Sequence, residues 1–179
     1  AQISVPGFGQ NMYPVEVVTS CPRRDIAIIK FKDAASIVQQ IHPLNLLHTG
    51  GRCQQGAQIQ AWGFPLGQSN CKITCGQYCG DQEMAGGHTL LQTSAALNHG
   101  NSGCPLVTMY DGKPVVAAIA CSIIQGASNI GYGIPVNSIR AVCKDFEVQQ
   151  SKILRGPVLG VAWSPMTQPM AEFLGNVDE

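Results

Sequence analysis

The chain has 179 residues, enough for one domain or two small ones, and 45% of them are hydrophobic. Lysine plus arginine and aspartate plus glutamate each total 11, so the net charge is zero and only 12% of residues are charged. This balance argues against electrostatic binding to nucleic acid or to an anionic membrane surface, which needs a clustered excess of one sign. No apolar stretch is long enough to span a bilayer as a helix.

Short runs rich in β-branched residues, separated by turn signals, predict strands along most of the chain. They cover residues 15–20, 25–31, 56–64, 72–80, 89–94 and 115–124, with a loop at 83–88. Because no helix intervenes and the strands follow at hairpin spacing, we expect an antiparallel barrel or sandwich. The one expected helix is capped by Asn137 or Ser138 and ends near Gln150.

The eight cysteines indicate free thiols rather than a disulfide framework, since the chain is longer than most disulfide-rich secreted proteins and the cysteines lie mostly among apolar residues. This favours a reducing intracellular compartment such as the cytosol or an organelle matrix. Cys71, Cys75 and Cys79 recur at four-residue steps, which predicts one face of a strand rather than a metal site. We expect neither a metal nor a cofactor.

The strongest local signal is LQTSAALNHGNSGCPLV at residues 91–107. Its Gly100-Asn101-Ser102-Gly103 sequence permits a tight turn in which backbone N–H groups converge beside the serine hydroxyl, as in an oxyanion hole. The G-x-S-x-G elbow of α/β-hydrolases is not matched, because Cys104 stands at its second glycine. Glycine-rich serine turns are also common structural features, so the loop alone leaves a purely structural role open.

Four segments in order resemble the HtrA/Deg family of trypsin-like serine proteases: DIAIIK at 25–30, AWGFPLGQ at 61–68, the serine loop at 91–107, and GYGIPVN at 131–137. The resemblance implies an all-β, trypsin-like double antiparallel β-barrel with one C-terminal helix, and an endopeptidase that cleaves exposed or unfolded polypeptide. The residues that it implicates are Ser102 as the nucleophile, Asp25 as the acid that orients a histidine, the N–H groups of Gly100 and Ser102 as the oxyanion hole, and Ala96, Ala120, Cys121 and Ser122 as an uncharged specificity pocket for aliphatic side chains.

The catalytic histidine of the family does not occur at its expected place. It should lie upstream of Asp25, where this sequence has 24 residues and no histidine. His99 lies in the oxyanion loop and would point toward substrate, and the other three, at 42, 48 and 88, are expected in loops. A proton-accepting base is indispensable to an activated serine. We therefore expect a preceding segment, a cleaved piece or a partner chain to supply both this histidine and the missing strands of the first barrel.

Three domain segments are expected: residues 1–50 as the remainder of the first barrel, 51–150 as the second barrel and its helix, and 151–179 as a linker or the start of a PDZ-like module. Cys104 stands where the family has glycine, and we expect it to pack behind the serine loop. A homo-oligomer or a larger complex is the expected setting. The alternative reading, a catalytically inactive protease-like fold serving as a structural or peptide-binding component of a larger assembly, stays open on the sequence alone.

Overall fold

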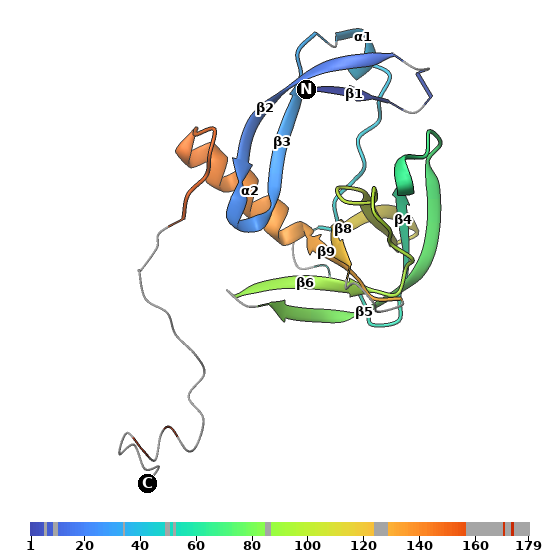
Figure 1. Ribbon diagram of the computed structural model, residues 1–179, viewed down its shortest axis with the longest axis vertical. Helices are drawn as coiled ribbons and strands as arrows, with labels where there is room; N and C mark the ends of the chain where they lie inside the picture. The colour runs from blue at the N-terminus through green and yellow to red at the C-terminus, as the bar shows by residue number, and fades with distance from the viewer. Residues whose placement is uncertain are drawn as a thin grey trace.

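The chain forms an antiparallel sheet and a closed barrel, joined by a helix (Figure 1). The computed structural model describes residues 1–5, 7–8, 11–33, 35–48, 51, 53–84, 87–123, 129–156, 170 and 173. Most of the expected linker or start of a PDZ-like module at residues 151–179 therefore lies outside the described residues. In the part of the chain that is described, no helix is both long and apolar enough to cross a membrane.

The first sheet contains β1 (Gln2–Ser4), β2 (Met12–Cys21) and β3 (Ile26–Phe31), in that order. Both of its strand pairs are antiparallel, and β2 has a bulge between Val17 and Thr19. Pro22 ends β2 and opens a 3₁₀ turn, Pro22–Arg24, because its fixed φ suits the start of a helical turn. A short helix, α1 (Ala35–Val38), follows the sheet.

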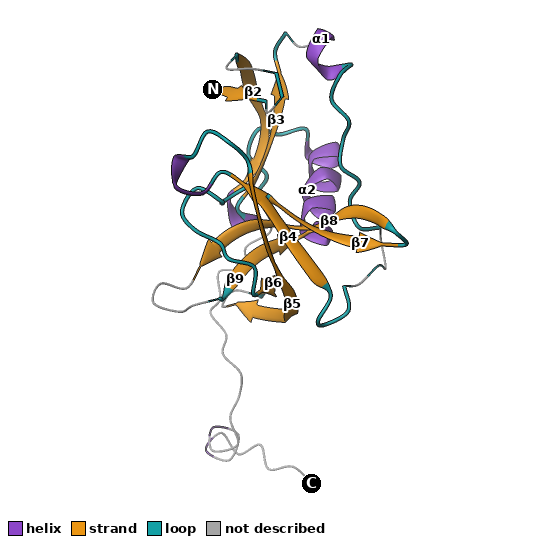
Figure 2. Cartoon of the chain, turned by 90° about the vertical axis from the view of Figure 1, so that its right-hand side faces the viewer, coloured by secondary structure: helices purple, strands orange, loops and turns teal. Residues whose placement is uncertain are grey.

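The second unit is a closed six-stranded barrel (Figure 2). Its strands are β4 (Gln58–Gly63), β5 (Lys72–Met84), β6 (His88–Thr93), β7 (Pro105–Tyr110), β8 (Lys113–Ile123) and β9 (Gly131–Pro135), in the spatial order β4-β5-β6-β9-β8-β7. All of its strand pairs are antiparallel. Inward side chains such as Ile59, Leu91 and Leu106 fill the interior together with several alanines. The expected antiparallel barrel is confirmed.

The long strand β5 corrects two predictions. It continues through Met84, so residues 83 and 84 belong to a strand rather than to the expected loop, and β6 begins at His88. Cys71 precedes the strand, and the register shifts between Tyr78 and Gly80, which leaves Cys79 as the extra residue of a bulge. Because a bulge breaks the alternation of side chains, the three cysteines do not share one strand face.

The cysteines carry free thiols, as expected, but not all of them are buried. Cys21 and Cys104 are buried, whereas Cys71, Cys75 and Cys143 are exposed. Apolar neighbours in the sequence do not show which face of a strand a cysteine occupies, so they did not separate the buried thiols from the exposed ones.

Helix α2 (Val136–Gln149) follows β9 directly. Pro135 occupies the position before the helix and offers no side-chain cap, so the predicted cap at Asn137 or Ser138 is wrong by two or three residues. The helix ends as expected, with Gln150 in the left-handed region. Its fully buried Val142 packs with Ile134 of β9 and with Cys21 and Ile26 of the first sheet. The helix thus fastens the sheet to the barrel.

The residues after α2 also return to the first sheet. Ser20 of β2 donates its N–H to the Lys152 carbonyl (2.9 Å) and accepts a hydrogen bond from the Leu154 N–H (2.8 Å). The buried Thr19 hydroxyl donates to the Ser151 carbonyl at 2.7 Å. Residues 151–154 therefore run beside β2 as a short parallel partner.

Candidate active site

Ser102 lies in a tight turn between β6 and β7 and is exposed to solvent. The Asn101 N–H donates to the Asn98 carbonyl (3.0 Å), and the Cys104 N–H donates to the Asn101 carbonyl (2.9 Å). Gly103 then donates its N–H to the Ala120 carbonyl of β8 at 2.7 Å. Hydrogen bonds on both sides of Ser102 therefore fix its backbone, while its side chain stays accessible.

Two backbone donors flank this serine. Within the described ranges, the N–H groups of Gly100 and Ser102 have no hydrogen-bond acceptor. Gly100 has a φ of +97°, and a Cβ built there would lie 2.6 Å from the Phe64 carbonyl oxygen, so only glycine fits this turn. Unpaired donors next to a nucleophile are what an oxyanion requires. The two N–H groups that the sequence singled out are therefore available for that role.

Asn101, which the sequence analysis did not single out, is the most unusual residue of the turn. It is only 3% exposed, and its Oδ1 has no hydrogen-bond partner among the described residues. The side chain rests on Gly63 at the end of β4, where a Cβ would come within 2.6 Å of that oxygen. A buried polar atom without a hydrogen-bond partner is costly, so the position of Asn101 directly before Ser102 is a feature that the fold maintains against a penalty.

Asp25 follows the 3₁₀ turn and adopts φ 53° and ψ 42°, in the left-handed region. Its N–H donates to the Pro22 carbonyl at 3.3 Å, and no partner for its exposed carboxylate is found in the described part of the chain. Asp25 lines a cavity of about 270 Å³ together with His88, Cys121 and Ser138. The turn therefore presents a carboxylate at the boundary between the first sheet and the barrel.

Strand β8 connects the surroundings of Ser102 with those of Asp25. Ala120 accepts the hydrogen bond from Gly103, and the next residue, Cys121, lines the Asp25 cavity. Cys121 is the extra residue of a bulge, because Ala120 pairs with Gly133 and Ser122 with Tyr132. A bulge of this kind commonly redirects a side chain next to a functional site.

The residues predicted for the specificity pocket occupy different environments. Ala96 follows β6 and is exposed, and its carbonyl accepts a hydrogen bond from the Thr74 hydroxyl at 2.8 Å. Ala120 is buried, and Cys121 is half-buried with its thiol 3.5 Å from the Tyr132 carbonyl. Ser122 lies in β8, but its side chain is outside the described residues. Their grouping into one pocket stays a prediction.

The histidines occupy four separate places. His42 is exposed after α1, and His48 lies 2.9 Å from the Tyr110 hydroxyl. His99 is exposed in the serine loop, where its carbonyl accepts the Leu66 N–H at 2.7 Å. His88 was expected in a loop but is the first residue of β6 and lines the Asp25 cavity. Sequence reasoning missed it because the length of the β5–β6 hairpin is not evident from composition.

The thiol of Cys104, two residues after Ser102, is buried. Burial raises its pKa from the ordinary 9.0 to about 11, and the nearby Cys71 adds to the increase. A thiol that is protonated at neutral pH is a poor nucleophile. This agrees with the expected packing role. No group of three His, Cys, Asp or Glu side chains that could hold a metal ion occurs in the described ranges.

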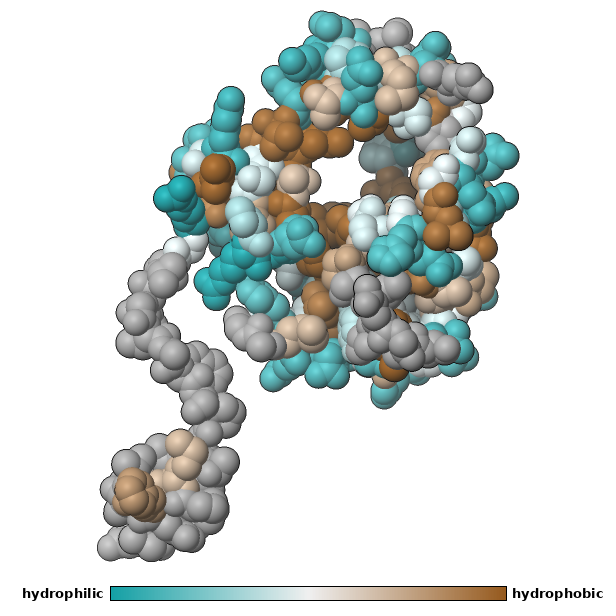
Figure 3. Space-filling model, viewed as in Figure 1, coloured by the Kyte–Doolittle hydropathy of each residue, from teal (hydrophilic) through white to brown (hydrophobic). Residues whose placement is uncertain are grey.

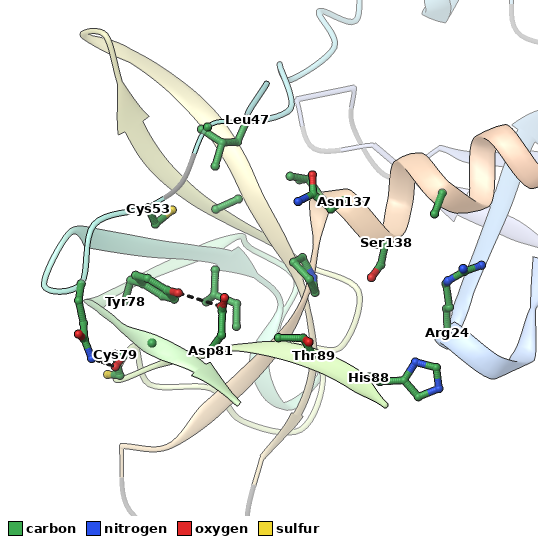
Figure 4. A pocket seen from close by; sticks show the side chains of 18 of the residues that line it. Arg24, Leu47, Cys53, Tyr78, Cys79, Asp81, His88, Thr89, Asn137 and Ser138 are labelled. Atoms are coloured by element: carbon green, nitrogen blue, oxygen red, sulfur yellow. Dashed lines mark hydrogen bonds between the residues drawn. The ribbon is translucent and has the colours of Figure 1, made fainter. Parts of the chain in front are cut away.

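A larger cavity of about 1000 Å³ lies between the first turn of α2 and the β5–β6 hairpin (Figure 4). Arg24, His88 and Ser138 lie toward one end of it, and Cys53, Tyr78 and Cys79 toward the other. The Tyr78 hydroxyl donates to the Asp81 carboxylate at 2.8 Å. Since Arg24, His88 and Ser138 line the Asp25 cavity as well, the two cavities adjoin.

A closed antiparallel barrel beside a second sheet, with an exposed serine turn and an aspartate near their boundary, is the architecture of a trypsin-like protein. Residues 2–117 match the family model described as a trypsin-like peptidase domain. The chain is 30% identical over 166 residues to serine protease HTRA4 of Mus musculus, an alignment that covers 86% of this chain and 32% of the relative. It is 28% identical over 150 residues to serine protease HTRA1 of Xenopus laevis, covering 79% and 30% respectively.

Among solved structures, a variant of the HtrA-type protease AlgW with a tripeptide superposes with a TM-score of 0.73 at 26% identity. The superposition covers 92% of this chain and 52% of AlgW. The chain thus belongs to the trypsin-like peptidase family, and the relatives that it resembles are of the HtrA type. It spans about a third of the length of the curated relatives that it matches.

Proposed function

We propose that this protein is an HtrA-type serine endopeptidase that cleaves exposed or unfolded polypeptide segments. The observation that carries the proposal is the exposed Ser102, held in a turn closed by three hydrogen bonds and flanked by the unpaired N–H groups of Gly100 and Ser102. Such a turn combines an accessible nucleophile with donors for the charge that develops during attack.

Each group then has a chemical role. The Ser102 hydroxyl attacks the peptide carbonyl and gives its proton to a histidine, while the Gly100 and Ser102 N–H groups stabilise the oxyanion. The Asp25 carboxylate holds the histidine in the correct tautomer. The histidine passes the proton to the departing amine, which leaves an acyl group on Ser102, and a water molecule then hydrolyses this ester. An uncharged pocket of Ala96, Ala120, Cys121 and Ser122 would select aliphatic side chains.

The first sheet supports the proposal that another segment or chain completes the site and contributes the histidine. In the described residues β3 pairs only with β2, so its other edge is open. Val17 and Ile29 are direct cross-strand partners, yet they are 50% and 48% exposed. Figure 3 shows an opening between the sheet and the barrel, with hydrophobic residues on part of its rim. An open edge beside exposed apolar side chains favours pairing with further strands.

A fluorophosphonate probe tests the proposal, because the probe modifies only a serine whose hydroxyl is activated. The intact natural protein, isolated with any segment or chain bound to it, should be labelled at Ser102, and it should hydrolyse an unfolded protein substrate. The Ser102→Ala variant should be neither labelled nor active, while its circular dichroism spectrum stays like that of wild type. If the intact assembly is neither labelled nor active, the protein is an inactive member of its family, and the proposal is wrong.

A further inference from the structure

The backbone of Asp25 adopts a conformation that needs support from its surroundings. Its φ of 53° is in the left-handed region, which a residue with a side chain rarely occupies. Such residues persist where neighbouring contacts over-determine them, and they occur most often at functional sites. The hydrogen bond from the Asp25 N–H to the Pro22 carbonyl is long at 3.3 Å. The contacts of the residues next to Asp25 therefore matter for its position.

The preceding residue, Arg24, makes such a contact. Its Nη1 donates to the Asp145 Oδ2 of helix α2 at 2.8 Å, and this is the only ion pair within the residues that the structure describes. The hydrogen bond with Asp145 is also the main reason that the pKa of Arg24 is raised. Arg24 lines the same cavity as Asp25, and Figure 4 shows its side chain near His88 and Ser138. The ion pair thus connects the Asp25 turn with the helix.

Helix α2 is in turn fixed to the barrel that carries Ser102. It continues from β9 without a break, and β9 pairs with β8, whose Ala120 holds the serine turn. The side chain of Val142 in α2 is fully buried and packs in one cluster with Ile134 of β9. The path from Asp145 to Ser102 therefore runs through packed and hydrogen-bonded elements. The Arg24–Asp145 pair thus stands on a continuous line of contacts between the turn that carries Asp25 and the barrel.

We propose that Arg24 and Asp145 are positioning residues, which set the orientation of the Asp25 carboxylate relative to Ser102. This inference rests on the proposed function and adds two residues to its site. The side chains of the pair are 31% and 40% exposed, and exposed ion pairs contribute little to folding stability. Loss of the pair should therefore lower kcat strongly and the free energy of unfolding only slightly, because a small displacement of a catalytic group greatly slows the reaction.

A charge-reversal experiment on the intact natural protein tests this role. Arg24→Asp and Asp145→Arg should each lower kcat about tenfold or more, with little change in KM, since the substrate still binds and only the geometry of the acid is altered. The double variant restores an ion pair in the opposite sense and should recover kcat to within about threefold of wild type. Glu147→Arg is the matched control, because Glu147 is exposed on α2 and makes the same charge change without touching the pair.

Hydrogen exchange gives a second readout that does not depend on activity. The amides of residues 23–27 should exchange faster in each single variant and return toward the wild-type rate in the double variant, while the midpoints of denaturant unfolding stay close to that of wild type. Unchanged exchange and unchanged kcat in the single variants would overturn the inference, as would a double variant no better than either single one. If wild type itself cleaves nothing, the proposed function fails, and the exchange rates alone then decide whether the pair holds the Asp25 turn.

Discussion

Replacing Gly63 by alanine should disturb the turn that carries Ser102, because Gly63 packs against two residues of that turn. Gly63 is buried at the end of β4, and its backbone φ is not in the left-handed region, so the backbone itself accepts an alanine. The added Cβ, however, would lie 2.6 Å from the Asn101 Oδ1 and 3.0 Å from the Cys104 Cβ. Both neighbours must shift, and Asn101 immediately precedes Ser102.

The expected loss of stability follows from the size of this overlap. Inserting one carbon atom into a packed interior costs about 1–3 kcal/mol. For a domain of this size, each kcal/mol lowers Tm by roughly 2–4 °C, so Tm should fall by roughly 2–12 °C. Displacement of Asn101 should also slow fluorophosphonate labelling of Ser102, because the turn no longer holds the hydroxyl in place.

Thermal unfolding and labelling rates together measure the effect, with Gly156→Ala as the control. A Cβ at Gly156 meets only the Arg23 Nη1 at 3.2 Å, which is the free end of a flexible side chain. Adding Asn101→Ala to Gly63→Ala removes the nearest clash, so the double variant should lose less stability than the sum of the two single variants. The reasoning is refuted if Gly63→Ala unfolds and reacts like wild type, or if Gly156→Ala is equally harmful.

Three further predictions concern the barrel. With a pKa of about 11, the Cys104 thiol should react with iodoacetamide far more slowly than the exposed Cys71 at pH 8. Since the folded-state pKa is raised above the ordinary 9.0, this thiol stabilises the fold fully below pH 9, and its contribution should disappear as the pH rises toward 11. Denaturant titrations from pH 8 to pH 11 should show this slope in wild type and a smaller one in Cys104→Ala. Leu106→Ala, at a side chain with 0% exposure, should cost about 2–5 kcal/mol in urea unfolding, against about 0.5 kcal/mol or less for Met109→Ala on the same strand, which is 59% exposed.

The sequence predicted parts of β2 to β6 and of β8, because alternation and turn residues are local signals, but it missed β1 and β7. It did not predict the bulge at Cys79 or the one at Cys121, since a bulge depends on the register of the partner strand. The start of α2 was misplaced because Asn137 and Ser138 are residues that commonly cap a helix, whereas the helix begins directly after Pro135 with no side-chain cap. These errors are small along the chain, but Cys121 and Ser138, which two of them concern, both line the Asp25 cavity.

The candidate site was predictable only in part. Ser102 and its glycines form a contiguous motif that composition alone makes visible, and the structure gives that motif a closed turn. Asn101 was missed because burial of a polar side chain is a tertiary property. His88 was missed for a similar reason, since only the folded hairpin brings it to the cavity of Asp25. The union of Asp25 and Ser102 in one catalytic centre stays a prediction.

The hydrogen bonds between β2 and residues 151–154 have a consequence for how the molecule would respond to a cut in its backbone. The first sheet is attached to the barrel through the connecting stretch before β4, and again through α2 and the residues that follow it. A protease that severed the exposed residues 42–45 would therefore produce two polypeptides that remain one particle. They should separate on a denaturing gel but elute together from a sizing column.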